Sequence, residues 1–368
     1  MDNKDEEFMR MALRQARMGL GRTSPNPMVG AVIVRKGKII ASGYHKRAGA
    51  CHAEVDALEK LGDKVRAGDT LYVTLEPCNH FGRTPPCTEA ILRSGIKKIV
   101  VGMADPNPQV AGGGCKTLSE KGVEVKTGVL ESECRRINEV FLKYTTTGLP
   151  YVVAKSALTM DGWTATSTGH SKWITSEASR RFVHRLRDRV DGVMVGVGTV
   201  LADDPQLTTR IERRKGRDPA RIIVDAHLRI PEHAKVLNSD SPSMTLIAVG
   251  QDVPHGRLKR IEERGITPLV CPLREGRIDL KALLEMLGQR AYTSLLVEGG
   301  STLLGSMIRE RLIDKVYIFM APKIFGGNDG IPMASGPGPK TMDACLKLRN
   351  VKVRRFGDDL LIRGYPEY

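Results

Sequence analysis

The chain has 368 residues and a hydrophobic content of 41%, enough for two domains of ordinary size and too apolar for a disordered protein. Its net charge of +15 favours anionic partners such as phosphorylated small molecules, whereas an aromatic content of 5% is poor material for stacking nucleic-acid bases. No apolar run approaches the roughly 20 residues of a membrane helix, and the acidic N-terminus lacks the apolar core of a signal peptide, so we expect no membrane association.

The first part of the chain alternates between predicted helices and strands. Apolar residues near helical spacing predict a helix over 5–20, and the turn Ser24-Pro25-Asn26-Pro27 leads from it into a strand. Further helices are expected at about 52–61 and, behind Pro86, at about 87–94. The strands are expected at 29–34, 39–44, 71–75, 99–103 and 123–125. This alternation predicts an α/β sandwich over residues 1–147.

A metal-binding pattern runs from His52-Ala53-Glu54 to Pro77-Cys78 and Cys87. One histidine and two cysteines can hold a zinc ion and leave its fourth tetrahedral position to water, and a carboxylate two residues after the histidine can carry protons. Both cysteines are expected near helix N-termini, where the helix dipole favours thiolate. The pattern matches the H-x-E…P-C-x-x-C signature of zinc-dependent base deaminases, with a longer spacing between the cysteines.

A closed structural zinc site is the alternative interpretation of the same residues. Cys51 or His80 would supply the fourth ligand of such a site, and the domain would then be a binding module without catalysis. Glu54 argues against this alternative, because a structural site has no use for a carboxylate beside the metal. The seven cysteines are scattered without a disulfide framework, so a cytoplasmic location is expected.

The second part of the chain begins after Thr145–Pro150, a polar segment marked by glycine and proline that predicts a domain boundary. Helices are expected near 176–188, 279–288 and 301–310. Strands are expected at 151–158, 192–197, 221–224, 245–249, 295–297, 316–319, 351–353 and 360–362. These elements predict a second α/β domain with a large sheet over residues 148–368.

Two glycine-containing turns in this second part are candidates for cofactor binding. The segment Gly196–Leu201 lacks the third glycine of a dinucleotide-binding fingerprint, so we reject that interpretation. In Glu298-Gly299-Gly300-Ser301-Thr302 a strand ends and a helix begins, and backbone N–H groups there can approach a pyrophosphate. A plain strand–helix turn remains the commoner interpretation of two glycines.

The motif residues together resemble those of a known family. With His52-Ala53-Glu54, the loop from Glu76-Pro77-Cys78 to Gly82-Arg83-Thr84-Pro85-Pro86-Cys87, and the second domain, the chain resembles the RibD family of bifunctional riboflavin-biosynthesis enzymes. Generic cytidine deaminases use the shorter Pro-Cys-x-x-Cys, whereas the longer loop is typical of this family. The resemblance covers nearly the whole chain. It implies a cytidine-deaminase-like α/β/α sandwich followed by a dihydrofolate-reductase-like α/β domain.

The resemblance also implies two reactions. The first domain would use zinc to deaminate 2,5-diamino-6-ribosylamino-4(3H)-pyrimidinone 5′-phosphate. Its implied ligands are His52, Cys78 and Cys87, and Glu54 is the implied general acid and base. Asn26, His45 and Arg83 would contact the substrate, although a solvated loop position is a fair alternative for His45 and Arg83.

The second domain would use NADPH to reduce the ribosyl group of 5-amino-6-(5-phosphoribosylamino)uracil to ribityl. The residues that the resemblance places against the cofactor are Ala157, Trp173, Thr199, Asp203, Gly300, Ser301 and Thr302. Those that it places against the substrate are Lys155, Ser171, Arg187, Leu207, Arg210 and Glu298. Spacing alone selects neither NADPH nor this substrate.

Three further interpretations stay open from the sequence. A nucleic-acid deaminase with an appended domain would need a basic groove with aromatic platforms, and no such stretch is evident. Activity of only one of the two halves is a second alternative. The sequence also leaves open whether the chain is a homo-oligomer.

Overall fold

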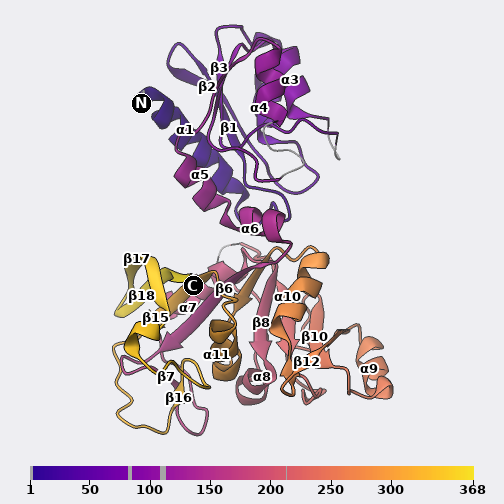
Figure 1. Ribbon diagram of the computed structural model, residues 1–368, viewed down its shortest axis with the longest axis vertical. Helices are drawn as coiled ribbons and strands as arrows, with labels where there is room; N and C mark the ends of the chain where they lie inside the picture. Colours follow the sequence, from indigo (N-terminus) through magenta and orange to yellow (C-terminus); the bar gives the residue numbers. More distant parts are fainter. Residues whose placement is uncertain (1–2, 82–84, 108–112, 213) are drawn as a thin grey trace. The chain divides into compact units, whose positions relative to one another are not determined.

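The computed structural model describes residues 3–81, 85–107, 113–212 and 214–368 (Figure 1). The chain divides into two compact units, Met1–Gly148 and Leu149–Tyr368. None of the helices among these residues combines the length and the apolar character needed to cross a membrane.

The first unit is built on a five-stranded sheet in the order β2-β1-β3-β4-β5. β1 is antiparallel to both of its neighbours, while β3, β4 and β5 run parallel. The strands are β1 Gly30–Arg35, β2 Lys38–Tyr44, β3 Thr70–Val73, β4 Lys98–Val101 and β5 Glu124–Lys126. The central strands are almost continuously apolar and buried, as expected for a sheet covered on both faces.

Two glycines show how helices cover both faces of this sheet. A Cβ atom on Gly30 would lie 2.1 Å from the Ala12 carbonyl oxygen, and one on Gly43 would lie 2.3 Å from that of Ala53. Gly43 pairs with Ala31, the neighbour of Gly30, so the two glycines point to opposite faces. The helices that contain Ala12 and Ala53 therefore pack on opposite faces and make a three-layer sandwich.

The helices of the first unit complete these layers (Figure 1). They are α1 Asn3–Ala16, α2 Ala53–Leu61, α3 Cys87–Ser94, α4 Gly113–Glu120, α5 Glu131–Ile137 and α6 Glu139–Thr147, with short 3-10 turns at Arg17–Gly19 and Gly62–Lys64. α6 ends at Thr147 and is capped by Gly148, which has the left-handed φ of 71° that favours glycine.

The second unit is built on a nine-stranded sheet in the order β11-β10-β9-β8-β14-β6-β15-β18-β17. The strands from β11 to β15 run parallel, and β18 and β17 are antiparallel additions at one edge. The strands are β6 Tyr151–Leu158, β8 Gly192–Gly196, β9 Ala220–Val224, β10 Thr245–Gly250, β11 Thr267–Cys271, β14 Ser294–Val297, β15 Lys315–Met320, β17 Lys347–Phe356 and β18 Asp359–Glu367.

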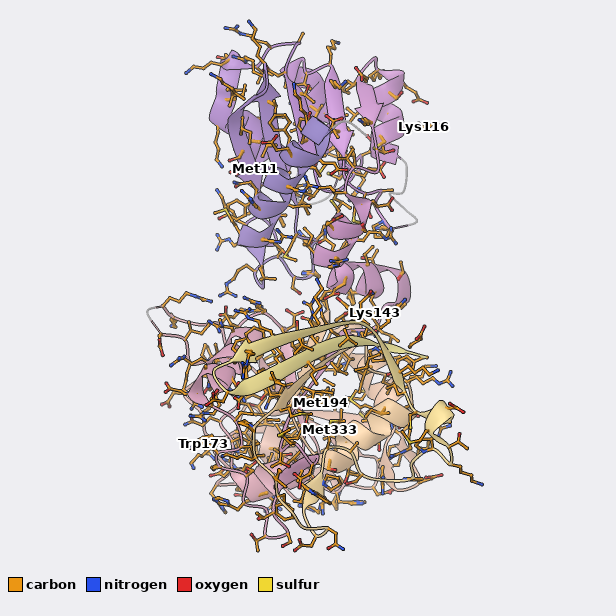
Figure 2. All side chains as sticks on the ribbon, turned by 90° about the vertical axis from the view of Figure 1, so that its left-hand side faces the viewer. Met11, Lys116, Lys143, Trp173, Met194 and Met333 are labelled. Carbon is orange, nitrogen blue, oxygen red and sulfur yellow. The ribbon has the colours of Figure 1, made fainter. Side chains whose placement is uncertain are left out.

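Both faces of the larger sheet are covered. Met194 is fully buried in one core cluster with residues of α10 and α11, while its neighbours Val193 and Val195 belong to a cluster on the other face (Figure 2). The helices are α7 Glu177–Arg187, α8 Val197–Asp203, α9 His255–Glu262, α10 Leu280–Gln289 and α11 Ser301–Arg309, with a 3-10 turn at Met342–Ala344. Two short ladders, β7 Trp163–Ala165 with β16 Ile331–Pro332 and β12 Leu273–Arg274 with β13 Arg277–Ile278, lie outside the main sheet.

Some elements differ from the sequence-based expectation. The first helix ends at Ala16 and continues only as a 3-10 turn to Gly19, short of residue 20. Thr145–Thr147, within the segment predicted as a domain boundary, form the last turn of α6, a helix that the sequence analysis did not predict. Their hydroxyl groups obscure the helical pattern, and Thr146 and Thr147 each donate a hydrogen bond to the Lys143 carbonyl one turn earlier. The sequence analysis did not predict α4, α5, α6, α8, α9, β11 or the short strands β7, β12, β13 and β16.

Candidate active sites

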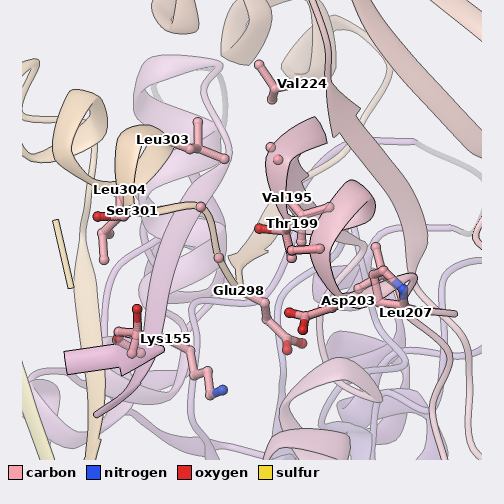
Figure 3. Close-up of a pocket in the computed structure, with 18 of the residues that line it drawn as sticks. Lys155, Val195, Thr199, Asp203, Leu207, Val224, Glu298, Ser301, Leu303 and Leu304 are labelled. Carbon is pink, nitrogen blue, oxygen red and sulfur yellow. The ribbon is translucent and has the colours of Figure 1, made fainter. Parts of the chain in front are cut away.

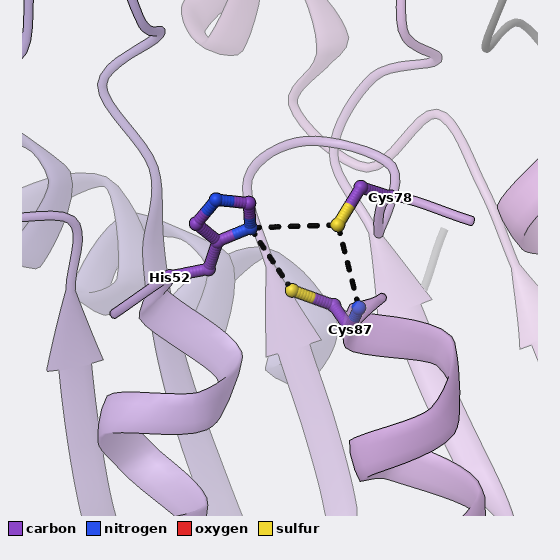
Figure 4. Close-up of side chains that lie close together, drawn as sticks. All are labelled: His52, Cys78 and Cys87. Carbon is purple, nitrogen blue, oxygen red and sulfur yellow. Dashed lines mark hydrogen bonds between the residues drawn. The ribbon is translucent and has the colours of Figure 1, made fainter. Parts of the chain in front are cut away.

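Three metal-ligand side chains meet in the first unit (Figure 4). His52 immediately precedes α2, Cys78 follows β3 in the loop, and Cys87 is the first residue of α3. His52 Nδ1 lies 3.1 Å from Cys87 Sγ and 3.4 Å from Cys78 Sγ, and the Cys87 N–H donates to Cys78 Sγ at 3.3 Å. Two helix starts and a strand end thus bring together residues up to 35 positions apart in the sequence.

The donor set fits a zinc ion. Tetrahedral coordination at ordinary Zn–N and Zn–S lengths separates a nitrogen and a sulfur by about 3.5 Å, close to the distances from the His52 nitrogen to both sulfurs. The hydrogen bond between the two thiols lowers the pKa of Cys78 to about 4 and raises that of Cys87. Such a pair holds one proton between two sulfurs, and a divalent cation can replace that proton.

A fourth protein ligand is not found among the described residues. The cluster contains His52, Cys78 and Cys87 alone, and the side chains of Cys51 and His80 are exposed. Glu54, in the first turn of α2, is 3% exposed, and burial raises its pKa to about 7. An open three-ligand set beside a buried carboxylate favours catalysis over the closed structural site.

A cavity of about 410 Å³ opens beside these ligands and is lined by Asn26 and His45 as well as by Glu54. The His45 Nδ1 atom lies 3.1 Å from the Cys51 carbonyl oxygen, which can only accept, so Nδ1 carries the proton. In the neutral ring Nε2 then accepts from Asn26 Nδ2 at 3.1 Å. Burial lowers the pKa of His45 and supports that neutral form. Arg83, the third predicted substrate contact, lies outside the described residues.

Glu76 is a buried residue of this site that the sequence analysis did not single out. Its side chain is 3% exposed and lines the cavity. One carboxylate oxygen accepts from the Asp105 N–H at 3.1 Å and the other from the Cys115 N–H at 3.0 Å. Glu76 therefore ties the loop after β4 and the start of α4 to the segment that carries Cys78. The sequence offers only its place before Pro77-Cys78 as a signal, because it does not reveal burial.

A second, larger cavity of about 1970 Å³ lies in the second unit (Figure 3). Its lining includes all thirteen residues that the sequence analysis assigned to cofactor and reductase substrate. They come from the carboxyl-end half of β6, from α7 and α8, from the loops around 171–173 and 207–210, from the turn after β14, and from the start of α11. The volume exceeds the 300–1,000 Å³ of an ordinary ligand site and suits two ligands together.

A buried ion pair forms the floor of this cavity. Arg187 donates from Nε to Glu298 Oε1 at 2.5 Å and from Nη2 to Oε2 at 2.8 Å, and Nη1 donates to the Thr208 carbonyl at 2.8 Å. Burial alone would raise the pKa of Glu298, but the charge of Arg187 lowers it. Lys155 points into the same space, and burial lowers the pKa of its ammonium group (Figure 3).

The remaining predicted residues surround this centre. Ser171 donates to Asp203 Oδ1 at 3.2 Å, and the Arg210 N–H donates to His184 Nδ1 at 3.2 Å. Trp173 is 61% exposed at the outside of the unit, with the Arg180 guanidinium 4.3 Å above its ring (Figure 2). His184 and Arg180 also line the cavity, and no sequence motif pointed to either residue.

The turn before α11 suits a phosphate-bearing cofactor. Gly300 has a φ of 87°, and a Cβ atom on Gly299 would lie 3.2 Å from the Thr199 hydroxyl oxygen. Neither position accommodates a side chain without strain, so backbone stays accessible from the cavity where the helix begins. Ser301 Oγ lies 2.5 Å from Ser335 Oγ, which fixes the first residue of α11.

Comparisons with known proteins assign each part of the chain to a known domain family. The protein-family model for the RibD C-terminal domain matches residues 150–362 of this chain. The family model for the cytidine and deoxycytidylate deaminase zinc-binding region matches residues 2–103. The riboflavin biosynthesis protein RibD of Aquifex aeolicus is 44% identical over 97% of both chains, and that of Escherichia coli is 38% identical over 98% of both.

Solved structures give the same result. RibD of Acinetobacter baumannii (form 1) superposes with a TM-score of 0.90 at 36% identity and 99% coverage of both chains. A diaminohydroxyphosphoribosylaminopyrimidine deaminase/5-amino-6-(5-phosphoribosylamino)uracil reductase from Thermotoga maritima superposes with a TM-score of 0.85, also at 36% identity and 99% coverage of both.

Proposed function

The chain belongs to the RibD family of riboflavin biosynthesis proteins, and from that membership we propose which of its residues carry out each reaction. It is a bifunctional enzyme of riboflavin biosynthesis with a deaminase and a reductase domain, and its cofactors are zinc and NADPH. We assign the deaminase to residues 1–147 and the NADPH-dependent reductase to residues 148–368. The open His52, Cys78 and Cys87 cluster beside buried Glu54 is the observation that carries the proposal.

The deamination replaces an amino group of the pyrimidine by oxygen and releases ammonia. The substrate is 2,5-diamino-6-ribosylamino-4(3H)-pyrimidinone 5′-phosphate. Zinc, when bound by His52, Cys78 and Cys87, supplies a water of lowered pKa as the nucleophile. Glu54 accepts a proton from that water and returns protons to the ring nitrogen and to the leaving amine.

Three residues bind the deaminase substrate. Asn26 and His45 line the cavity next to Glu54, and their mutual hydrogen bond holds both side chains in place for the base and ribose. Arg83 binds the phosphate, because its fork of donors suits two phosphate oxygens.

The reduction opens the ribosyl ring of 5-amino-6-(5-phosphoribosylamino)uracil to a ribityl chain. NADPH supplies the hydride when bound. Hydride addition at the sugar carbon that bears the amine would break the bond from that carbon to the ring oxygen and leave the electron pair of that bond on oxygen. Lys155 donates a proton to this oxygen, since burial lowers the pKa of its ammonium group.

The other residues of the large cavity orient the two reactants. Glu298 and Arg187, held to each other by two hydrogen bonds, contact the substrate together with Ser171, Leu207 and Arg210. The cofactor contacts are Ala157, Trp173, Thr199, Asp203, Gly300, Ser301 and Thr302. Rate enhancement in the reduction then comes from positioning the nicotinamide against the sugar carbon.

Product analysis by mass spectrometry tests both assignments on the full chain. The zinc-loaded protein is incubated with the phosphorylated diaminopyrimidine, with and without NADPH. We expect the deaminated ribosyl compound alone without NADPH, and its ribityl product, two hydrogens heavier, when NADPH is present. Unchanged substrate in the first incubation refutes the deaminase assignment, and a deaminated product that NADPH leaves unreduced refutes the reductase assignment.

A further inference from the structure

A small hairpin at the rim of the large cavity presents two arginines side by side. In the β12–β13 ladder Leu273 pairs with Ile278 and Arg274 pairs with Arg277. Ile278 is 5% exposed in the core, and Leu273 packs against the same cluster. Because neighbouring residues of a strand point to opposite faces, both arginines lie on the other face, and both line the cavity.

This arrangement places two positive charges directly opposite each other. Cross-strand like charges destabilise a ladder, and this one has only two residues in each strand. Within the described ranges neither guanidinium makes a hydrogen bond or an ion pair, although Glu310 lies near enough for Arg274 to lower its pKa, which burial raises. Glu275, in the turn between the arginines, also lines the cavity. The guanidinium groups of Arg274 and Arg277 are therefore free to bind an anion, and a bound anion would offset the repulsion between their positive charges.

Close packing holds the hairpin beside the end of β9. The Gly250 N–H donates to the Ala226 carbonyl at 2.9 Å, and a Cβ atom on Gly250 would lie 2.9 Å from Leu273. A larger residue at position 250 would require the Leu273 side chain or the Ala226 carbonyl to shift. Ala226, His227 and Arg229, in the turn after β9, also line the cavity, so the hairpin and this turn share one end of it.

The reacting centre lies at a different part of the same cavity. Glu298 follows β14, and β8 separates β14 from β9 in the sheet, so the two ends are about 10 Å apart at ordinary strand spacing. Lys155, on β6, is one strand further away. A ligand with its reactive group at Lys155 and Glu298 must be long to reach the hairpin.

We propose that Arg274 and Arg277 form a binding site for a phosphate monoester, the 2′-phosphate of NADPH, and thereby select NADPH over NADH. This inference rests on the proposed reductase function. The nicotinamide must lie at Lys155 and Glu298, and the dinucleotide extends from there past the start of α11 to its adenosine end. The phosphate of the pyrimidine substrate lies only a few bonds from the reacting sugar carbon, so it is too close to that centre to reach the arginines.

Calorimetric titration of the full chain with 2′,5′-ADP and 5′-AMP tests the site without turnover. We expect wild-type protein to bind 2′,5′-ADP at least about tenfold more tightly, as a charge-assisted hydrogen bond predicts. The double variant Arg274→Gln/Arg277→Gln should bind both nucleotides equally. The control Arg349→Gln/Arg355→Gln removes two exposed β17 arginines outside the cavity and should keep the preference. Equal binding of the two nucleotides by wild-type protein overturns the proposal.

Steady-state kinetics separates the possible sources of the phosphate. In the Gln double variant we expect KM for NADPH to rise about tenfold or more, with KM for NADH, KM for the pyrimidine and kcat little changed. A rise in KM for the pyrimidine alone would assign the arginines to the substrate phosphate and overturn the cofactor assignment. If the Gln double variant does not fold, the Arg274→Lys/Arg277→Lys variant tests the site instead. It keeps both positive charges, so it should still bind 2′,5′-ADP more tightly than 5′-AMP, but with a smaller difference in affinity than wild-type protein. If wild-type protein binds 2′,5′-ADP selectively but does not reduce the deaminated substrate, the result would contradict the proposed reductase function and leave the phosphate site supported.

Discussion

Replacing Glu298 by alanine should both unfold the second unit at lower temperature and abolish the reduction. The side chains of Arg187 and Glu298 are only 13% and 6% exposed, and two hydrogen bonds join them. The substitution leaves Arg187 without its carboxylate in a buried place, next to the second buried cation, Lys155. An unpaired buried charge is among the most costly defects that a single substitution creates.

The expected cost follows from the burial of this pair. Removing one partner of a buried ion pair costs about 3–5 kcal/mol, and Arg187 keeps one hydrogen bond, to the Thr208 carbonyl, so we expect the lower end of that range. For a unit of this size 1 kcal/mol lowers Tm by about 2–4 °C, which gives a decrease of about 6–12 °C for 3 kcal/mol.

Differential scanning calorimetry of the full chain measures this shift, and nicotinamide absorbance measures the reduction of deaminated substrate. Glu232→Ala is the matched control, because Glu232 is 77% exposed and lies 3.9 Å from Arg264. Its loss should cost less than about 1 kcal/mol and leave both activities intact. Glu298→Gln keeps the shape of the side chain but removes its charge, so it separates the effect of losing the charge from the effect of losing side-chain volume.

Deamination by the Glu298→Ala variant should persist, since Glu298 belongs to the other unit from the zinc ligands. A variant that melts within about 2 °C of wild type would show that the ion pair contributes little, against the general rule for buried pairs. Reduction at the wild-type rate would remove Glu298 from the reductase site.

Other predictions concern the deaminase site and the division of the chain. Glu54→Gln should retain zinc and lose deamination by about 10²–10⁴-fold, because the proton carrier is gone; a near wild-type rate would exclude Glu54 as the base. The 1–147 fragment should contain one zinc by elemental analysis, and a metal-free active fragment would contradict the ligand assignment. Arg83→Ala should raise KM for the phosphorylated substrate more than it lowers kcat; an unchanged KM would make Arg83 a solvated loop residue. The 148–368 fragment should fold and oxidise NADPH in the presence of deaminated substrate. A folded fragment without this activity would show that residues 148–368 are not an active reductase without the first unit.

Local sequence patterns were sufficient for much of the first site. The spacing of His52 and Glu54 across a helix start depends on a few neighbouring residues, and Pro86 marks the start of the helix that carries Cys87. A set of one histidine and two cysteines restricts the chemistry further, because few metals other than zinc prefer it. Whether Cys51 or His80 joins the set was undecidable, since that depends on the path of the loop.

The sequence does not reveal which charged residues pair with partners far away in the chain. Arg187 and Glu298 are 111 positions apart, and a helix face rich in arginine gives no sign of which one is buried. Glu76 likewise receives two backbone N–H groups from residues 29 and 39 positions away. Burial and partner choice are properties of packed elements, so a charged residue looks the same in sequence whether it is solvated or enclosed.

The sequence by itself determined much of the alternation of strands and helices, the division into two α/β domains and three candidate zinc ligands, because each follows from residue type at short spacing. Only the tertiary structure decided the nine-strand order, which gathers the carboxyl ends of β6, β8, β9 and β14 at one cavity, and the register that sets Arg274 opposite Arg277. Strand order and register depend on contacts between distant segments, and their free energy comes from the surface that those segments bury together.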